Sequence, residues 1–141
     1  MKIKFKRLSE FAIKPTKAHA DDAGYDFYAT DMVEENGAYV YHTGIAVDIP
    51  QGYVGLVFPR SSVARTDIIL TNCVGVIDSG YTGEVTAKFK ILSGKEQPCI
   101  YHLGERIFQM IIIPIPEIEF EEVNELRKTD RGSGGYGSSG K

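Results

Sequence analysis

The chain has 141 residues and a mass of 15.6 kDa, the size of one domain rather than two. Hydrophobic residues make up 43% of it and charged residues 25%, a balance typical of a globular protein that buries its own core. The net charge of -3 argues against general binding to nucleic acid, which requires a basic surface.

Features of secreted and membrane proteins are missing from the sequence. In residues 1–7, charged residues alternate with hydrophobic ones, and this segment lacks the apolar stretch of a secretory signal. The longest apolar run, 110–115, is too short to span a bilayer. Cys73 and Cys99 have apolar neighbours and do not form a CxxC motif. We therefore expect them to be reduced core residues rather than a disulfide or a zinc site. These features predict a cytoplasmic protein that does not bind membranes.

Apolar and polar residues alternate along much of the chain. Residues 3–6, 45–49 and 85–91 follow this pattern, which predicts strands with one solvated face. Residues 53–58 form a further predicted strand, closed by Pro59.

Residues 107–113 are almost continuously apolar, which is typical of a strand buried on both faces, although Gln109 interrupts the run. The only helix we expect is one or two turns ending near Arg65 and capped by Ser61 or Ser62. Residues 118–126 fit strand and helix spacing equally. Many short strands between turns predict an all-β sandwich or barrel.

The end of the chain differs from everything before it. Residues 131–141 are nearly all glycine and serine and cannot pack a core. We therefore expect a β domain over residues 1–130 and, over 131–141, a C-terminal arm that is flexible without ligand.

Five short polar islands lie where predicted strands end or turn. Their polar residues are Asp26; Arg60, Ser61 and Ser62; Asp78 and Tyr81; Arg106 and Gln109; and Arg131 and Tyr136. Each island alone has an ordinary explanation: residues 78–80 suit a turn, and the arm suits a disordered end. Together, three arginines, several hydroxyls, two acids and an amide suit a polyphosphate with Mg²⁺. An aspartate can also serve as general base for an attacking water.

In order and spacing, the islands resemble the five motifs of the trimeric dUTPases (dUTP pyrophosphatases) over residues 23–140. The resemblance implies a jelly-roll-like β fold and a homotrimer whose active sites are each built from three chains. It implies Mg²⁺-dependent hydrolysis of dUTP to dUMP and pyrophosphate, which limits uracil in DNA and supplies dUMP for dTMP synthesis. In each active site, one subunit would supply the first, second and fourth motifs, a second subunit would supply the third motif, and the third subunit would supply the arm.

The resemblance also assigns roles in the third motif. Asp78 would deprotonate the water that attacks the α-phosphorus, and Tyr81 would pack under the deoxyribose and exclude a 2'-hydroxyl. The uracil edge would be read by a side chain and by the backbone of a hairpin. These uracil-reading residues would be Asn72, Gly75, Val76 and Ile77.

The other motifs would hold the phosphates and the metal. Ser61 would donate to the oxygen that bridges the α- and β-phosphorus. Asp26 and Gln109 would hold waters on Mg²⁺, with the phosphates as its direct ligands, and Tyr136 would stack on the uracil. The remaining contacts with the substrate would come from Arg60, Ser62, Arg106, Gln109, Arg131, Gly137, Ser138 and Ser139.

Some positions depart from the family pattern. This chain has Gly80 where the family frequently has Asp, and Thr82 where it frequently has Arg or Gln. It has Tyr136 in place of Phe, Ser139 in place of Thr, and Phe108 in place of a small residue. We expect Phe108 to change packing near the trimer axis. Two other functions remain open: a dCTP deaminase relative, disfavoured because residues 86–89 lack the glutamate of that family, and a dUTP-sensing interaction protein.

Overall fold

The computed structural model describes residues 1–92 and 94–135, and regular structure within them is all strand apart from one 3₁₀ helix. In chain order the elements are β1 (Lys4–Arg7), β2 (Tyr25–Tyr28), β3 (Asp31–Glu35), β4 (Ala38–His42), β5 (Ile45–Asp48), β6 (Tyr53–Pro59), η1 (Ser61–Arg65), β7 (Ile68–Leu70), β8 (Gly75–Ile77), β9 (Ala87–Ile91) and β10 (Arg106–Pro114). The predicted all-β class is confirmed. None of the described helical turns is long and apolar enough to cross a membrane.

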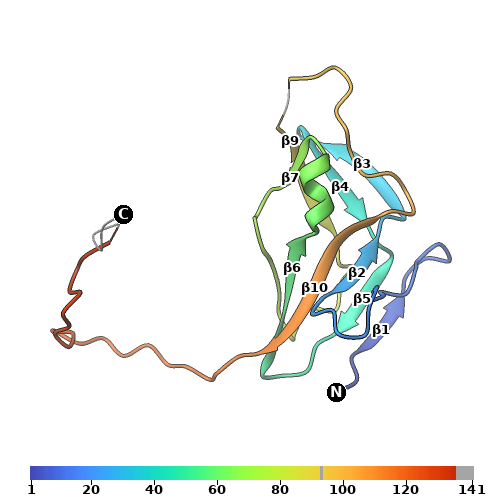
Figure 1. Ribbon diagram of the computed structural model, residues 1–141. Helices are drawn as coiled ribbons and strands as arrows, with labels where there is room; N and C mark the ends of the chain where they lie inside the picture. The colour runs from blue at the N-terminus through green and yellow to red at the C-terminus, as the bar shows by residue number, and fades with distance from the viewer. Residues whose placement is uncertain (93, 136–141) are drawn as a thin grey trace.

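Two four-stranded antiparallel sheets form the body of the protein. One has the order β2-β10-β6-β8 and the other β3-β4-β9-β7, while β1 pairs with β5 in a small third sheet. The two larger sheets lie against each other with the hydrophobic core between them (Figure 1). This is the sandwich that the short alternating strands predicted.

Aromatic side chains from both sheets fill the core. Phe27 and Phe108 stack with ring centroids 5.0 Å apart, and Tyr41 meets Phe89 edge to face at 5.6 Å. The hydroxyl of Tyr41 donates to the carbonyl oxygen of Tyr101 at 2.9 Å. Burial raises the pKa of Tyr41 to about 12, so this donor stays protonated at neutral pH.

A bulge in β10 decides which side chains share a face. The pairing of β10 with β2 shifts between Arg106 and Phe108, so that Arg106 lies opposite Tyr28 while Gln109 lies opposite Asp26. In a regular strand, residues three apart point to opposite faces. The extra residue puts Arg106 and Gln109 on the same face, because their partners are two apart on β2.

Several details differ from the sequence-based predictions. Cys73 and Cys99 are exposed free thiols rather than core residues, because each lies in a surface loop. Phe108 is fully buried and stacks on Phe27 in the chain's own core, as predicted for a strand buried on both faces; its effect near a trimer axis stays a prediction. The N-cap of η1 is Arg60, with no side-chain hydrogen bond, where Ser61 or Ser62 was expected.

Two predicted strands are less buried than expected. All four residues of β1 are exposed, because β1 pairs with β5 at the rim of the fold rather than covering the core. In β10 the buried residues lie in the first half, and Ile113 at its far end is 38% exposed. Beyond Met110, β10 pairs with β6 and no longer with β2.

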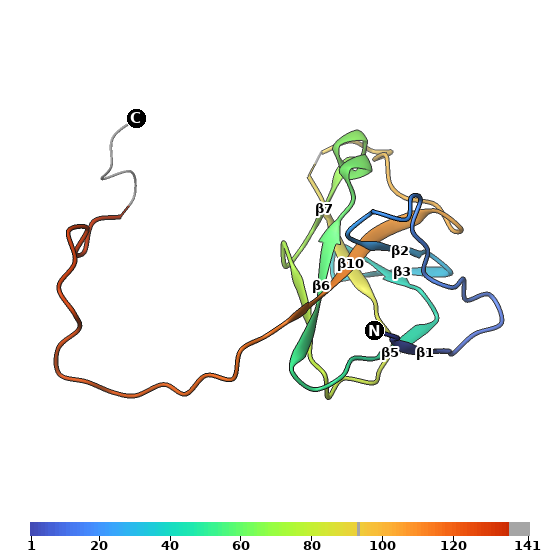
Figure 2. The same ribbon diagram turned by 60° about the horizontal axis from the view of Figure 1, so that its bottom comes forward.

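After β10 the chain leaves the body. Residues 116–135 form no strand or helix and run away from the sheets in both views (Figures 1 and 2). Apolar side chains along this segment are exposed, including Ile118 at 69%, Phe120 at 95% and Leu126 at 85%. Such a row of uncovered hydrophobes is typical of a surface that another chain covers.

Candidate active site

The carboxylate of Asp26 joins two arginines from different strands. Nε of Arg60 donates to Oδ1 at 2.7 Å, and Nη1 of Arg106 donates to Oδ2 at 3.1 Å. Arg60 follows β6 directly, and Arg106 opens β10, so the bulge and the strand order bring both to β2. The side chain of Asp26 is only 13% exposed, so water screens these pairs weakly. One negative charge between two positive charges leaves the cluster net positive.

Gln109 lies beside this cluster as the cross-strand partner of Asp26. Directly opposite residues on an antiparallel pair have side chains on one face, close enough to touch. The amide nitrogen of Gln109 donates to the carbonyl oxygen of Pro59 at 3.3 Å. The space for its amide oxygen exists because residue 24 is glycine: a Cβ there would lie 2.6 Å from that oxygen.

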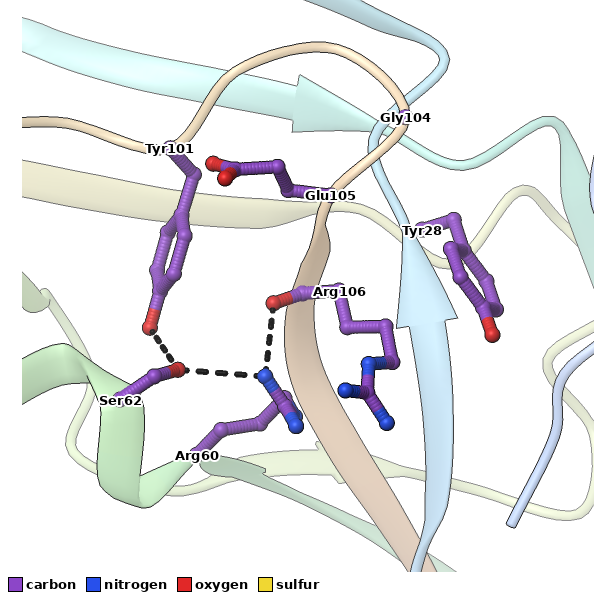
Figure 3. Close-up of a pocket in the computed structure, with 7 residues that line it drawn as sticks. All are labelled: Tyr28, Arg60, Ser62, Tyr101, Gly104, Glu105 and Arg106. Carbon is purple, nitrogen blue, oxygen red and sulfur yellow. Dashed lines mark hydrogen bonds between the residues drawn. The ribbon is translucent and has the colours of Figure 1, made fainter. Parts of the chain in front are cut away.

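A pocket of about 270 Å³ opens next to the two arginines (Figure 3). Nη1 of Arg60 donates to the hydroxyl of Ser62 at 3.2 Å and to the backbone carbonyl of Arg106 at 3.3 Å. The hydroxyls of Ser62 and Tyr101 are 3.0 Å apart. The guanidinium of Arg60 is therefore held on three sides, and the pocket is lined by two arginines together with the carboxylate of Glu105 (Figure 3). The arginine forks are the groups in this lining that match the oxygens of an anion.

The oxygen atoms of this cluster suit magnesium held through water. Each carboxylate oxygen of Asp26 accepts one arginine bond and keeps a further lone pair. No group of three or more His, Cys, Asp or Glu residues lies together in the described chain, so a site built entirely from such side chains is excluded there. Magnesium typically keeps several waters and uses one or two protein oxygens plus substrate phosphates. Asp26 and Gln109 fit that arrangement.

A second group of predicted site residues lies on β8 and in the loops on either side of it. We call it the β8 group; it consists of Asn72, Gly75, Val76, Ile77, Asp78 and Tyr81. β8 pairs with β6 alone and is the edge of its sheet, so its outer backbone groups are free to bind a ligand. Val76 is 61% exposed on this edge, Asp78 and Asn72 are exposed, and Gly75 is buried against Val57. An edge strand that offers both N–H and C=O groups is able to read a planar base.

Tyr81 and Glu84 hold the loop after β8 together. The hydroxyl of Tyr81 donates to the carbonyl oxygen of Glu84 at 2.8 Å. The carboxylate of Glu84 accepts bonds from the backbone of Thr43 and Gly44 and lies 2.9 Å from Nδ1 of His42. Burial raises the pKa of Glu84, but these hydrogen bonds outweigh it and hold that pKa below the usual 4.5.

The predicted site residues therefore form separate groups within one chain. Among the described residues no hydrogen bond or ion pair joins the Asp26 cluster to the β8 group, and no residue of the β8 group lines the pocket. Arg131 is exposed on the extended segment, where its Nε donates to the carbonyl oxygen of Gly134. Four predicted residues lie outside the described part of the chain: Tyr136, Gly137, Ser138 and Ser139.

Sequence reasoning missed three residues of these groups. Tyr28 and Tyr101 line the pocket, and Glu84 anchors the loop that carries Tyr81. Tyr101 lies 39 positions from Ser62, and no local pattern connects the two. Glu84 lies three positions after Tyr81 and directly follows Gly83, and an acid directly after a glycine was the available signal.

The sequence matches the family model described as dUTPase over residues 10–140. Two bacterial relatives are described as deoxyuridine 5'-triphosphate nucleotidohydrolase. The relative from Gloeobacter violaceus is 37% identical over 145 residues, covering 99% of this chain and 97% of its own. The relative from Corynebacterium glutamicum is 41% identical over 142 residues, covering 99% and 95%.

Solved phage proteins have a similar fold. A mutant dUTPase of Staphylococcus bacteriophage 80alpha with dUpNHpp aligns with a TM-score of 0.84 and 32% identity, over 99% of this chain and 98% of that chain. A mutant dUTPase from phage phi11 of S. aureus, described with a structural Mg(II) ion, aligns with a TM-score of 0.75 and 29% identity, over 89% and 98%.

The structure predicts that Asp26 is needed for stability as well as for the site. In Asp26→Asn an amide NH₂ faces one of the arginines, so we expect a loss of about 1.5–3 kcal/mol in the free energy of unfolding. Urea unfolding at one protein concentration measures this. Asp48→Asn is the control, because the Lys4–Asp48 pair is exposed and should contribute about 0.5 kcal/mol or less. Equal effects of the two substitutions would contradict a structural role for the Asp26 cluster.

Proposed function

Because the chain belongs to the dUTPase family, we propose that it hydrolyses dUTP to dUMP and pyrophosphate by attack of water on the α-phosphorus. The observation that carries the proposal is the convergence of Arg60 and Arg106 on Asp26, beside Gln109. Fixed guanidinium groups next to a polar pocket stabilise the charge of a triphosphate and of the pyrophosphate that leaves.

The phosphates bind along η1 and the start of β10. Arg60 is held by Asp26, Ser62 and the backbone of Arg106, so little conformational freedom is lost when it binds an anion. Ser61 is exposed at the first position of η1, where its hydroxyl can donate to the oxygen between the α- and β-phosphorus. Arg131, Gly137, Ser138 and Ser139 complete the contacts when the C-terminal arm closes over the substrate.

Asp26 and Gln109 are the residues that would hold a magnesium ion through water. Such an ion would neutralise part of the charge of the phosphates. Gln109 lies opposite Asp26, and the glycine at position 24 leaves room for the Gln109 oxygen.

The β8 group binds the nucleoside and activates the water. Asn72 and the backbone of Gly75, Val76 and Ile77 read the uracil edge, and Tyr136 stacks on its face. Tyr81 packs under the sugar. Asp78 accepts the proton of the attacking water, for which an exposed carboxylate on a loop is available.

These groups meet in a homotrimer with shared active sites. Among the described residues, none of the β8 group lines the pocket beside Arg60 and Arg106, and residues 116–135 run away from the sheets (Figure 2). The exposed side chains of Ile118, Phe120 and Leu126 pack against a neighbouring subunit in this assembly. A closed ring of identical contacts brings one group from each chain to every site.

Pyrophosphate release from dUTP, dTTP, dCTP and UTP, with Mg²⁺ and with EDTA, tests the function. We expect fast release from dUTP alone and strong inhibition by EDTA, because a polyphosphate needs its charge neutralised. Ammonia release from dCTP would instead indicate a deaminase. Release from dUTP that is indifferent to EDTA would contradict the role of magnesium.

The role of Asp78 predicts a selective loss of chemistry. Asp78→Asn keeps the shape of the side chain but removes the base, so turnover should fall by roughly 10²–10⁴-fold while dUTP still binds. Single-turnover hydrolysis and dUTP binding by calorimetry measure the two effects. Near-normal turnover would mean that another group takes the proton.

The role of the arm predicts that it is needed for turnover but not for folding. A chain ending at residue 130 should lose turnover and still form the trimer, because residues 131–135 make no contact with the sheets. Light scattering measures trimer formation, thermal unfolding measures stability, and the dUTP assay measures turnover. Dissociation or a large drop in melting temperature would show that the arm is structural.

A further inference from the structure

Glu84 attaches the end of the loop that carries Tyr81 to the body of the protein. The loop follows β8 and ends where Glu84 forms an isolated antiparallel bridge with Ala46 of β5. The side chain of Glu84 contacts the body, and its backbone contacts both the body at Ala46 and the loop at Tyr81.

The side chain of Glu84 binds the turn between β4 and β5. One carboxylate oxygen accepts the backbone N–H of Thr43 at 3.0 Å and of Gly44 at 2.7 Å, and the other lies 2.9 Å from Nδ1 of His42. Thr43 and Gly44 are buried, and Gly44 has a φ of +64°, which favours glycine. Without Glu84 these two N–H groups would have no partner in the described structure, so the carboxylate is a strong anchor.

The backbone of Glu84 holds Tyr81. The Tyr81 hydroxyl donates to the Glu84 carbonyl oxygen at 2.8 Å, although the side chain of Tyr81 is 44% exposed. The ring crosses Gly83 so closely that a Cβ there would lie 2.7 Å from the Tyr81 hydroxyl oxygen. An exposed tyrosine ordinarily samples several rotamers, and this hydrogen bond selects one of them.

We propose that Glu84 is a positioning residue that fixes the ring of Tyr81 and thereby sets the discrimination between deoxyribose and ribose nucleotides. The inference rests on the proposed function, in which Tyr81 packs under the sugar. A ring excludes a 2'-hydroxyl only if it cannot move aside, because a mobile wall gives way to one extra oxygen.

The test is the ratio of kcat/KM for dUTP to kcat/KM for UTP in three variants. Glu84→Ala removes the anchor, and Tyr81→Phe keeps the ring but removes the hydroxyl that binds Glu84. Both should lower the ratio by about 3- to 10-fold, mainly by raising kcat/KM for UTP. Glu84→Gln should stay within about twofold of the wild type, because its amide oxygen can still accept from Thr43 and Gly44.

The ratio separates positioning from folding. A variant that merely lowers the folded fraction loses activity toward both nucleotides equally, and the ratio stays unchanged. Glu35→Ala is the matched control, since that glutamate forms an exposed ion pair with Lys88 at 3.0 Å on the β3–β4–β9 part of the other sheet. The control should leave the ratio as in the wild type.

The outcomes distinguish this inference from the function on which it rests. A wild-type protein that does not hydrolyse dUTP would overturn the proposed function. An active wild type with an unchanged ratio in Glu84→Ala or Tyr81→Phe would overturn the positioning role alone. If Glu84→Ala fails to form the folded protein, Tyr81→Phe decides, because its exposed hydroxyl contributes little to folding.

Discussion

The carboxylate of Asp26 is the interaction on which the rest of the site depends. Two guanidinium groups repel each other when they approach, and a carboxylate between them removes that cost while leaving one net positive charge. Arg60 and Arg106 each bind a different oxygen of this carboxylate, so their directions are fixed as well as their positions. Asp26 therefore positions the two arginines, and each of its oxygens keeps a lone pair for the magnesium role that we propose.

The fold produces this meeting through strand order and one bulge. β10 lies between β2 and β6, so a side chain on β10 is next to both neighbours. The shift between Arg106 and Phe108 places Arg106 and Gln109 on the face of Asp26, while Ile107 and Phe108 are both fully buried in the core. A regular strand would have placed one of the two polar residues away from the site.

A single chain carries all the chemical groups but does not bring them together. The β8 group lies at a sheet edge, the Asp26 cluster lies at the pocket, and residues 116–135 extend away from the body. This distribution suits the proposed homotrimer, in which the C-terminal arm of one subunit would complete the active site of another. In the homotrimer that we propose, the exposed apolar side chains after β10 would pack against a neighbouring subunit and hold the arm in place.

The sequence by itself determined the β class and the positions of five of the ten described strands, because alternation of apolar and polar residues is a local signal. Through the family resemblance it also predicted Asp26, Arg60, Arg106 and Gln109 as site residues. It did not reveal that Asp26 pairs with both arginines, that Tyr101 supports Ser62, or that Glu84 anchors Tyr81. The exposure of both cysteines was likewise misjudged from neighbouring residues. Only the tertiary structure decided these points, because each depends on strand register and on contacts between residues far apart in the chain, and local patterns carry no information about either.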